Sequence, residues 1–161
     1  NLALALAFYD LKARVFAADI SAEAVMLGQR NARYLGLEDR VEFRSGDLLA
    51  PFDEPRFHGN VDLLVCNPPY ISSKKVDTMA GEIIGHEPRL AFDGGPLGIR
   101  IVERLVREAP RFLRRGGTLA FEVGLGQGPA LLKRLAKNTA YSGLRSIEDE
   151  AGEVRVILAV V

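Results

Sequence analysis

The feature that most constrains the fold is a short apolar run that ends in two consecutive prolines. Residues 61–66 read Val-Asp-Leu-Leu-Val-Cys, and Asn67, Pro68, Pro69 and Tyr70 follow directly. A run of β-branched residues and leucines that stops at a breaker predicts a buried β-strand. The prolines fix two φ angles and remove two backbone donors, and the residue before a proline is pushed out of the helical region. We therefore predict a rigid, extended corner that fixes where the Asn67 side chain points.

The rest of the chain alternates helical and strand patterns. Helices are predicted over residues 1–11, 21–35, 99–113 and 126–137, and strands over 14–20, 41–44, 61–66 and 118–123. Two further runs, 143–147 and 154–161, predict a closing antiparallel hairpin. This alternation predicts an α/β fold with a doubly wound, mostly parallel sheet and one antiparallel edge. Residues 71–98 are predicted to form a loop, and loops of that length are uncommon in compact domains unless they are functional.

Composition limits the class of protein. The 161 residues suit one domain, so we assign residues 1–161 to it. Lys and Arg number 21, as do Asp and Glu, and this zero net charge argues against broad nucleic-acid binding. Cys66 is the only cysteine and there are two histidines, so we expect neither a disulfide framework nor a metal site. No segment reads as a membrane span or a signal peptide, and we expect a cytoplasmic protein.

Acidic residues follow two of the predicted strands. Asp19 ends the strand over residues 14–20, and Asp47 follows the next strand, directly before Leu48. In nucleotide-binding α/β folds an acid after the strand accepts hydrogen bonds from ribose hydroxyls. Asp47 can accept one from an adenine amino group while Leu48 packs on the base. Either acid alone can equally be a turn residue. Because Asp19, Asp47 and Asn67 follow three successive strands, we favour a joint ligand site at the carboxyl ends of the strands.

The predicted corner has the groups needed to hold a planar nitrogen nucleophile. The Asn67 side-chain carbonyl can accept one N–H of an amide or amine, and the Pro68 backbone carbonyl can accept the second. Tyr70 can stack on the planar group. Such positioning can contribute roughly 7–11 kcal/mol to catalysis without a strong base. The simpler interpretation is a strand-ending turn. We favour the chemical one and predict Asn67, Pro68, Pro69 and Tyr70 as catalytic and substrate-binding residues.

Two signatures carry a family resemblance. Asn-Pro-Pro-Tyr after an apolar strand resembles the signature of S-adenosylmethionine-dependent amino-methyltransferases, and residues 87–95 resemble that of the protein glutamine N5-methyltransferases of the HemK/PrmC type. That family methylates the glutamine of the Gly-Gly-Gln tripeptide in peptide-chain release factors. Further segments resemble the family in order: Asp19-Ile20-Ser21, Gly46-Asp47, Arg114-Arg115-Gly116-Gly117, Phe121-Glu122-Val123-Gly124 with Gln127, and Ala151-Gly152 with Arg155-Val156. The resemblance covers essentially the whole chain.

The resemblance implies a fold, a cofactor and a partner. It implies a Rossmann-like fold, S-adenosyl-L-methionine as the cofactor, and a protein substrate, with a release factor as the expected partner. By the same resemblance Asp19, with Ile20 beside it, holds the cofactor ribose, and Asp47 and Leu48 flank the adenine. Asn67 then touches both cofactor and substrate.

The resemblance also implies a loop over the site and parts upstream of residue 1. Glu87, Pro88 and Arg89 are expected to form a salt-bridged strut rather than to react. A Gly-rich loop for the methionine part of the cofactor, the strand before it and an amino-terminal helical domain are expected before Asn1. The chain is therefore expected to be a fragment whose sheet lacks its middle strand. The glycines within residues 124–128 are interpreted as a strand-to-helix turn, not as a substitute for that loop.

Two alternatives remain open. The first is a nucleic-acid base methyltransferase, because the same corner suits the amino group of adenine or guanine. The zero net charge and residues 87–95 count against it, and we expect neither a nucleic-acid substrate nor a membrane partner. The second alternative is a truncated, non-catalytic relative, supported only by the lack of a Gly-rich loop.

Overall fold

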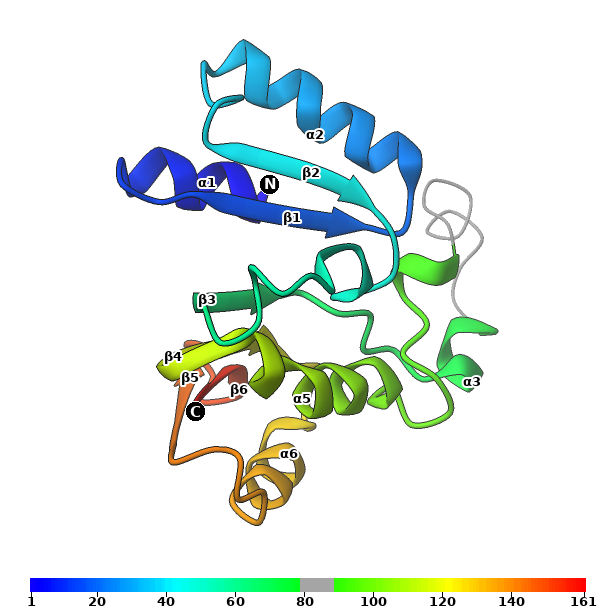
Figure 1. Ribbon diagram of the computed structural model, residues 1–161. Coiled ribbons are helices and arrows are strands. Elements are labelled where there is room, and N and C mark those ends of the chain that lie inside the picture. The colour runs from blue at the N-terminus through cyan, green and yellow to red at the C-terminus, as the bar shows by residue number, and fades with distance from the viewer. Residues whose placement is uncertain (79–88) are drawn as a thin grey trace. The chain divides into compact units, whose positions relative to one another are not determined.

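A computed structural model describes residues 1–78 and 89–161 (Figure 1). The described residues divide into two compact units, 1–54 and 55–161, and each unit is described by itself. No helix in the described ranges is long and apolar enough to cross a membrane. In the same ranges, no group of three or more His, Cys, Asp or Glu side chains is placed to hold a metal ion.

The first unit is a two-stranded parallel sheet with two helices. Its elements are α1 (Leu2–Tyr9), β1 (Val15–Asp19), α2 (Ala22–Tyr34), β2 (Val41–Ser45) and the 3-10 turn η1 (Ala50–Phe52). Strands β1 and β2 pair in register from Val15 opposite Val41 to Asp19 opposite Ser45. The core joins both helices to β2 through Leu4, Ala7, Ala32, Leu37 and Val41.

Local signals set the bounds of α2. The Ser21 hydroxyl accepts a hydrogen bond from the Ala24 amide at 3.1 Å, which satisfies one of the donors left over at a helix start. Gly36 follows the helix with a φ of 65°, a left-handed conformation that ends many helices. Asn1 stands at the N-cap of α1 as predicted, but its side chain makes no capping hydrogen bond.

The second unit is a four-stranded mixed sheet with flanking helices. Its elements are β3 (Val61–Cys66), α3 (Ser73–Val76), the 3-10 turn η2 (Arg89–Ala91), α5 (Arg100–Phe112), β4 (Leu113–Glu122), α6 (Gly128–Leu135), β5 (Gly143–Glu148) and β6 (Val154–Val160). The strand order is β3-β4-β6-β5. Strands β3 and β4 are parallel, and β6 is antiparallel to both of its neighbours. The predicted α/β class and closing hairpin are confirmed.

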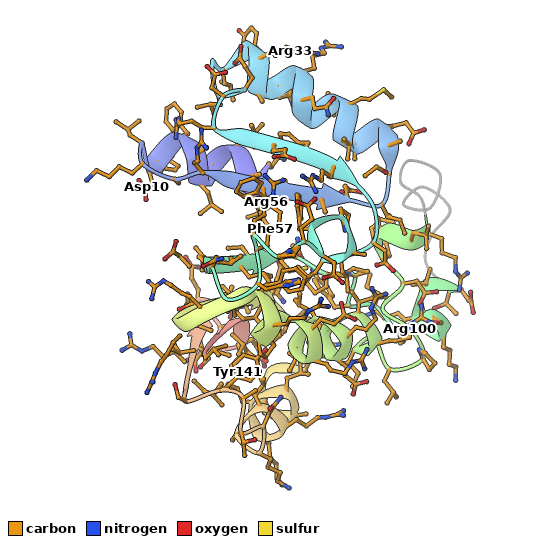
Figure 2. All side chains as sticks on the ribbon, in the orientation of Figure 1. Asp10, Arg33, Arg56, Phe57, Arg100 and Tyr141 are labelled. Carbon is orange, nitrogen blue, oxygen red and sulfur yellow. The ribbon has the colours of Figure 1, made fainter. Side chains whose placement is uncertain are left out.

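Alternating side chains of β4 and β6 build the core of the second unit. Leu119 lies opposite Ala159 and Phe121 opposite Ile157, and all four are fully buried. Helix α5 packs on β4 and α6 on β6. The Tyr141 hydroxyl donates to the Val106 carbonyl at 2.7 Å and so ties the segment after α6 to α5 (Figure 2).

Three features differ from the sequence prediction. Strand β4 begins at Leu113, not at residue 118, because Gly116 and Gly117 hydrogen-bond with Val161 at the end of the chain. The predicted loop over residues 71–98 contains α3 and η2. The described strands form two sheets rather than one doubly wound sheet, and half of their pairings are antiparallel rather than most being parallel.

Candidate functional site

The candidate residues of the first unit lie at the carboxyl edge of the β1–β2 sheet. Asp19 is opposite Ser45 in the parallel register, and the Gly46 amide donates to the Asp19 carbonyl at 2.9 Å. The chain after β2 therefore starts beside the end of β1. This pairing brings Asp19 and Asp47, both exposed, to the same edge, as the sequence predicted.

The Asp19 carboxylate is only partly used by the protein. Its Oδ1 accepts the Ser21 amide at 2.9 Å, which is the usual turn-forming bond of an aspartate before a helix. Within the described part of the chain its Oδ2 has no hydrogen-bond partner. Asp19 is therefore both a turn residue and an exposed acceptor.

Leu48 has the backbone conformation of a constrained site. Its φ of 48° makes it the only non-glycine with positive φ among the described residues. Such outliers carry a cost and are found preferentially at ligand clamps and active sites. Leu48 is half-buried and Ile20 is exposed. Two carboxylates with two aliphatic side chains fit the hydroxyl and amino donors and the flat base of an adenosine.

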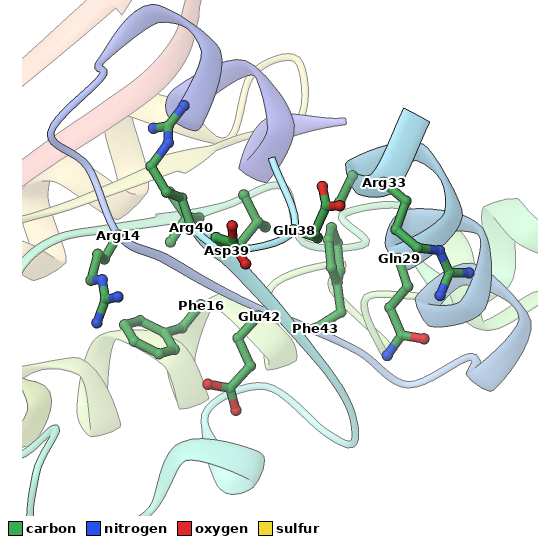
Figure 3. A pocket seen from close by; sticks show the side chains of 12 residues that line it. Arg14, Phe16, Gln29, Arg33, Glu38, Asp39, Arg40, Glu42 and Phe43 are labelled. Atoms are coloured by element: carbon green, nitrogen blue, oxygen red, sulfur yellow. The ribbon is translucent and has the colours of Figure 1, made fainter. Parts of the chain in front are cut away.

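A pocket of about 480 Å³ lies elsewhere in the first unit (Figure 3). Residues at the starts of β1 and β2 line it, together with Arg14 just before β1 and side chains of α2. The Arg40 guanidinium in its wall donates to the Asp10 and Ala13 carbonyls at 3.1 and 3.4 Å. This pocket is at the opposite end of the strands from Asp19 and Asp47, so it is not the predicted cofactor site.

The candidate residues of the second unit form the corner after β3. Pro68 is buried, whereas Asn67 is exposed and Pro69 and Tyr70 are half-buried. Across the described ranges, neither the Asn67 side-chain amide nor the Pro68 carbonyl oxygen has a hydrogen-bond partner. Two acceptors on consecutive residues are thus left available, as the sequence predicted.

Residues 92–98 pack against this corner through glycines. The Ile71 amide donates to the Phe92 carbonyl at 3.0 Å, and the Gly94 amide donates to the Ile71 carbonyl at 2.8 Å. A Cβ at Gly94 would lie 2.5 Å from the Pro69 carbonyl oxygen. A Cβ at Gly98, whose φ is 71°, would overlap the Tyr70 carbonyl oxygen. The glycines of this segment therefore allow the close backbone approach that encloses the corner.

Tyr70 is fixed by its hydroxyl. The hydroxyl donates to Glu122 Oε1 at 3.0 Å, and Arg155 Nη2 donates to the same oxygen at 3.4 Å. Burial raises the pKa of the Tyr70 phenol, and the Glu122 carboxylate raises it further. The phenol therefore stays protonated at neutral pH and acts as a donor.

Gln127 fixes the backbone on the other side of Tyr70. Its Nε2 donates to the Tyr70 carbonyl at 3.0 Å and to the Gly98 carbonyl at 3.4 Å. Its Oε1 accepts the Gly124 amide at 2.9 Å. One side-chain amide thus joins the corner, the glycine segment and the turn before α6.

The predicted strut is confirmed for Arg89, whereas Glu87 and Pro88 lie outside the described residues. Arg89 donates to Asp93 at 3.2 Å and to Asp77 at 2.6 Å. Asp93 also accepts the Ser73 hydroxyl at 2.7 Å and the Gly95 amide at 2.9 Å. These hydrogen bonds lower the pKa of Asp93, and the bond from Ser73 has the largest effect. The Asp93 carboxylate is therefore ionised at neutral pH.

Sequence reasoning missed the roles of Glu122, Gln127 and Arg155. All three lie in segments that carry the family resemblance, but nothing local to them points to Tyr70. Burial raises the pKa of the Cys66 thiol, next to Asn67, to about 11, so the thiol stays protonated at neutral pH.

Comparison with known proteins extends this picture. A family described as RMKL-like, methyltransferase domain, matches residues 4–83. A release factor glutamine methyltransferase of Moorella thermoacetica is 43% identical over 159 residues, which are 98% of this chain and 54% of that protein. A ribosomal protein uL3 glutamine methyltransferase of Bradyrhizobium diazoefficiens is 39% identical over 126 residues, 78% of this chain and 38% of that protein. The chain spans about half the length of the curated relatives it matches.

A solved structure supports the fold. The N-terminal domain of human METTL16 in complex with SAH matches 99% of this chain and 56% of that chain, with a TM-score of 0.63 and 15% sequence identity. At that identity the likeness shows the fold alone. The predicted Rossmann-like methyltransferase fold is confirmed.

Proposed function

We propose that this chain belongs to the protein glutamine methyltransferase family of the HemK/PrmC type and methylates the side-chain amide nitrogen of a protein glutamine, because it is similar over 98% of its length to release factor glutamine methyltransferases. The observation that carries this proposal is the corner after β3, where two unpartnered acceptors lie on consecutive residues beside an anchored tyrosine. We propose residues 1–161 as part of one catalytic domain.

The corner selects and orients the nucleophile. A primary amide has two N–H groups in one plane, and the Asn67 side-chain oxygen and the Pro68 carbonyl oxygen are the proposed acceptors for them. Tyr70 offers a flat ring face on which the amide can stack. Held in this way, the nitrogen directs its electron pair to one side, and most of the rate gain comes from orientation. The nitrogen uses that pair for the new N–C bond and releases one proton to water.

The first unit is proposed to bind the cofactor, S-adenosyl-L-methionine. When bound, this cofactor supplies an electrophilic methyl group whose carbon–sulfur bond breaks with both electrons remaining on sulfur. Asp19 would accept hydrogen bonds from the ribose hydroxyls, with Ile20 beside the sugar. Asp47 would accept a hydrogen bond from the adenine amino group, and Leu48 would pack on the base.

The proposed substrate is the Gly-Gly-Gln loop of a peptide-chain release factor. Glycines beside the target let the substrate backbone approach the corner closely. The zero net charge of the chain offers no general attraction to phosphates. Translation termination takes place in the cytoplasm, and we place the protein there.

Labelled methyl transfer by the full-length protein tests the function. We expect label in a release factor, lost when the Gly-Gly-Gln glutamine is replaced by alanine. Label in ribosomal protein uL3 alone would instead favour the substrate of the Bradyrhizobium relative. Label in nucleic acid but not in protein would overturn the proposal in favour of a base methyltransferase.

Replacing Asp19 with asparagine is expected to weaken S-adenosylmethionine binding by at least about tenfold. Asparagine keeps an oxygen for the Ser21 amide but loses the charge, and a hydrogen bond to a charged group contributes roughly 1.5–3 kcal/mol. Calorimetry on the full-length protein measures the change. Asp39→Asn, an exposed acid just before β2, is the matched control. An unchanged affinity in Asp19→Asn would mean that Asp19 only forms the turn and does not bind the cofactor.

A further inference from the structure

Tyr70 is held at both ends, whereas the two acceptors that precede it have no hydrogen-bond partner among residues 1–78 and 89–161. Glu122 binds its hydroxyl and Gln127 binds its carbonyl. The ring is also bordered by Gly124, where a Cβ would lie 3.0 Å from the Tyr70 ring edge. The orientation of the ring is therefore set by the protein before any substrate arrives.

We propose that Glu122 is a positioning residue for methyl transfer, and that it acts through Tyr70 by fixing the angle of the ring face against the target amide. The inference rests on the proposed function, since it concerns how the same corner holds its nucleophile. Glu122 touches neither substrate nor cofactor in this role.

The strand pairing gives Glu122 a rigid base. Cys66 of β3 lies opposite Phe121 of β4 in parallel register. Asn67 and Glu122 are the residues that come directly after this pair on their two strands. On its other side Glu122 lies opposite Val156 of β6. The carboxylate that anchors Tyr70 therefore comes from the strand next to the one that carries the corner, and backbone pairing fixes both.

The contact with Tyr70 is the main contact of this carboxylate. Tyr70 and Arg155 are the two groups seen to donate to Glu122, and the phenol is the closer, at 3.0 Å against 3.4 Å for the guanidinium. The Glu122 and Arg155 side chains are about a third exposed, and exposed ion pairs contribute little. Glu122 and Arg155 are also the two charged groups that shift the pKa of the Tyr70 phenol: the carboxylate raises this pKa and the guanidinium lowers it. A purely structural Glu122–Arg155 pair would not require the hydroxyl of Tyr70.

A double-mutant cycle in the full-length enzyme tests the coupling. Glu122→Leu removes the acceptor and Tyr70→Phe removes the donor, and each is expected to lower kcat by about tenfold because a misoriented nucleophile reacts slowly. The double variant is expected to be no slower than either single one, with KM for S-adenosylmethionine unchanged. Glu122→Gln keeps an acceptor oxygen and should restore most of kcat. Glu108→Leu, which removes a half-buried, ion-paired glutamate of α5, is the matched control and should leave kcat unchanged.

Losses that multiply in the double variant would overturn the inference, because Glu122 would then act independently of the Tyr70 hydroxyl. The cycle can be run on whichever acceptor the wild-type enzyme methylates. Failure of the release-factor assay and failure of the cycle are therefore separate results.

A titration without substrate gives a second readout. The tyrosinate absorbance of the wild type minus that of Tyr70→Phe reports the ionisation of Tyr70 alone. Because the Glu122 carboxylate raises the pKa of Tyr70, Glu122→Leu should lower that pKa toward the ordinary value of about 10. Tyr141→Phe, which removes a buried hydroxyl bound to the Val106 carbonyl, should leave the Tyr70 curve unchanged. A pKa that stays the same in Glu122→Leu would overturn the inference.

Discussion

Replacing Asn67 with alanine is expected to lower kcat for methyl transfer by about a hundred- to a thousandfold. Loss of one fixed hydrogen-bonding partner at a reacting group has an effect of this size. Asn67 is exposed and its amide is unpartnered in the described chain, so the fold does not depend on it. The loss should appear in kcat, measured by labelled methyl transfer with the full-length protein.

The stability of the Asn67→Ala protein separates chemistry from folding. Substitution of an exposed residue without partners usually changes the free energy of unfolding by less than about 0.5 kcal/mol. Asn60→Ala, just before β3, is the matched control, because Asn60 is exposed and its side chain donates, among the described residues, only to the Arg56 carbonyl, at 3.1 Å. It should leave kcat unchanged. Near-normal turnover by Asn67→Ala would exclude the corner as the place where the nucleophile is held.

Replacing Gly98 with alanine is expected to damage both the fold and the reaction. A φ of 71° costs a non-glycine residue roughly 1–2 kcal/mol, and the new methyl group would overlap the Tyr70 carbonyl oxygen. Relieving an overlap in a packed region costs typically about 1–3 kcal/mol more. The total loss in unfolding free energy is therefore about 2–5 kcal/mol, measured by denaturant titration. Because the Tyr70 backbone must shift, kcat should fall by about a hundredfold.

Gly59→Ala is the matched control for the conformational part of this cost. Gly59 has a φ of 67° and nothing within 4 Å of the added Cβ. Its replacement should cost only the roughly 1–2 kcal/mol of the left-handed conformation and should leave kcat unchanged. Equal effects of the two substitutions would mean that the Tyr70 contact is unimportant. A smaller effect at Gly98 would mean that the loop moves aside without cost.

Sequence predicted best where local signals decide the structure. The bounds predicted for β3, residues 61–66, are those observed, because an apolar run stops at a proline pair. The Ser21 cap was likewise predictable, since the capping oxygen and its amide are three residues apart. The start of β4 was predicted wrongly, because Gly116 and Gly117 form a turn-like sequence whose hydrogen bonds go to Val161, 44 or more residues away.

In the candidate site, too, local features were predictable from the sequence and contacts between distant residues were not. The positions of Asp19, Asp47 and Asn67 after their strands follow from the alternation of elements along the chain. The partners of Tyr70 do not, because Glu122 and Gln127 are 52 and 57 residues away. Their contacts depend on the register between β3 and β4 and on the turn before α6. Neither quantity is encoded in a local pattern, so only the three-dimensional structure reveals them.

The long sequence separation between the corner and its supports also fixes an order of events during biosynthesis. Protein synthesis proceeds from the amino terminus, so residues 61–70 leave the ribosome well before β4, α6 and β6. Until Arg155 has emerged, the Tyr70 phenol lacks its complete set of partners, and the β3–β4 pairing must close a loop of about fifty residues, which is slow. A nascent chain therefore carries the Asn-Pro-Pro-Tyr sequence before it carries an ordered corner. The proposed ability to hold a target amide is therefore acquired only after β4, α6 and β6 have been synthesised.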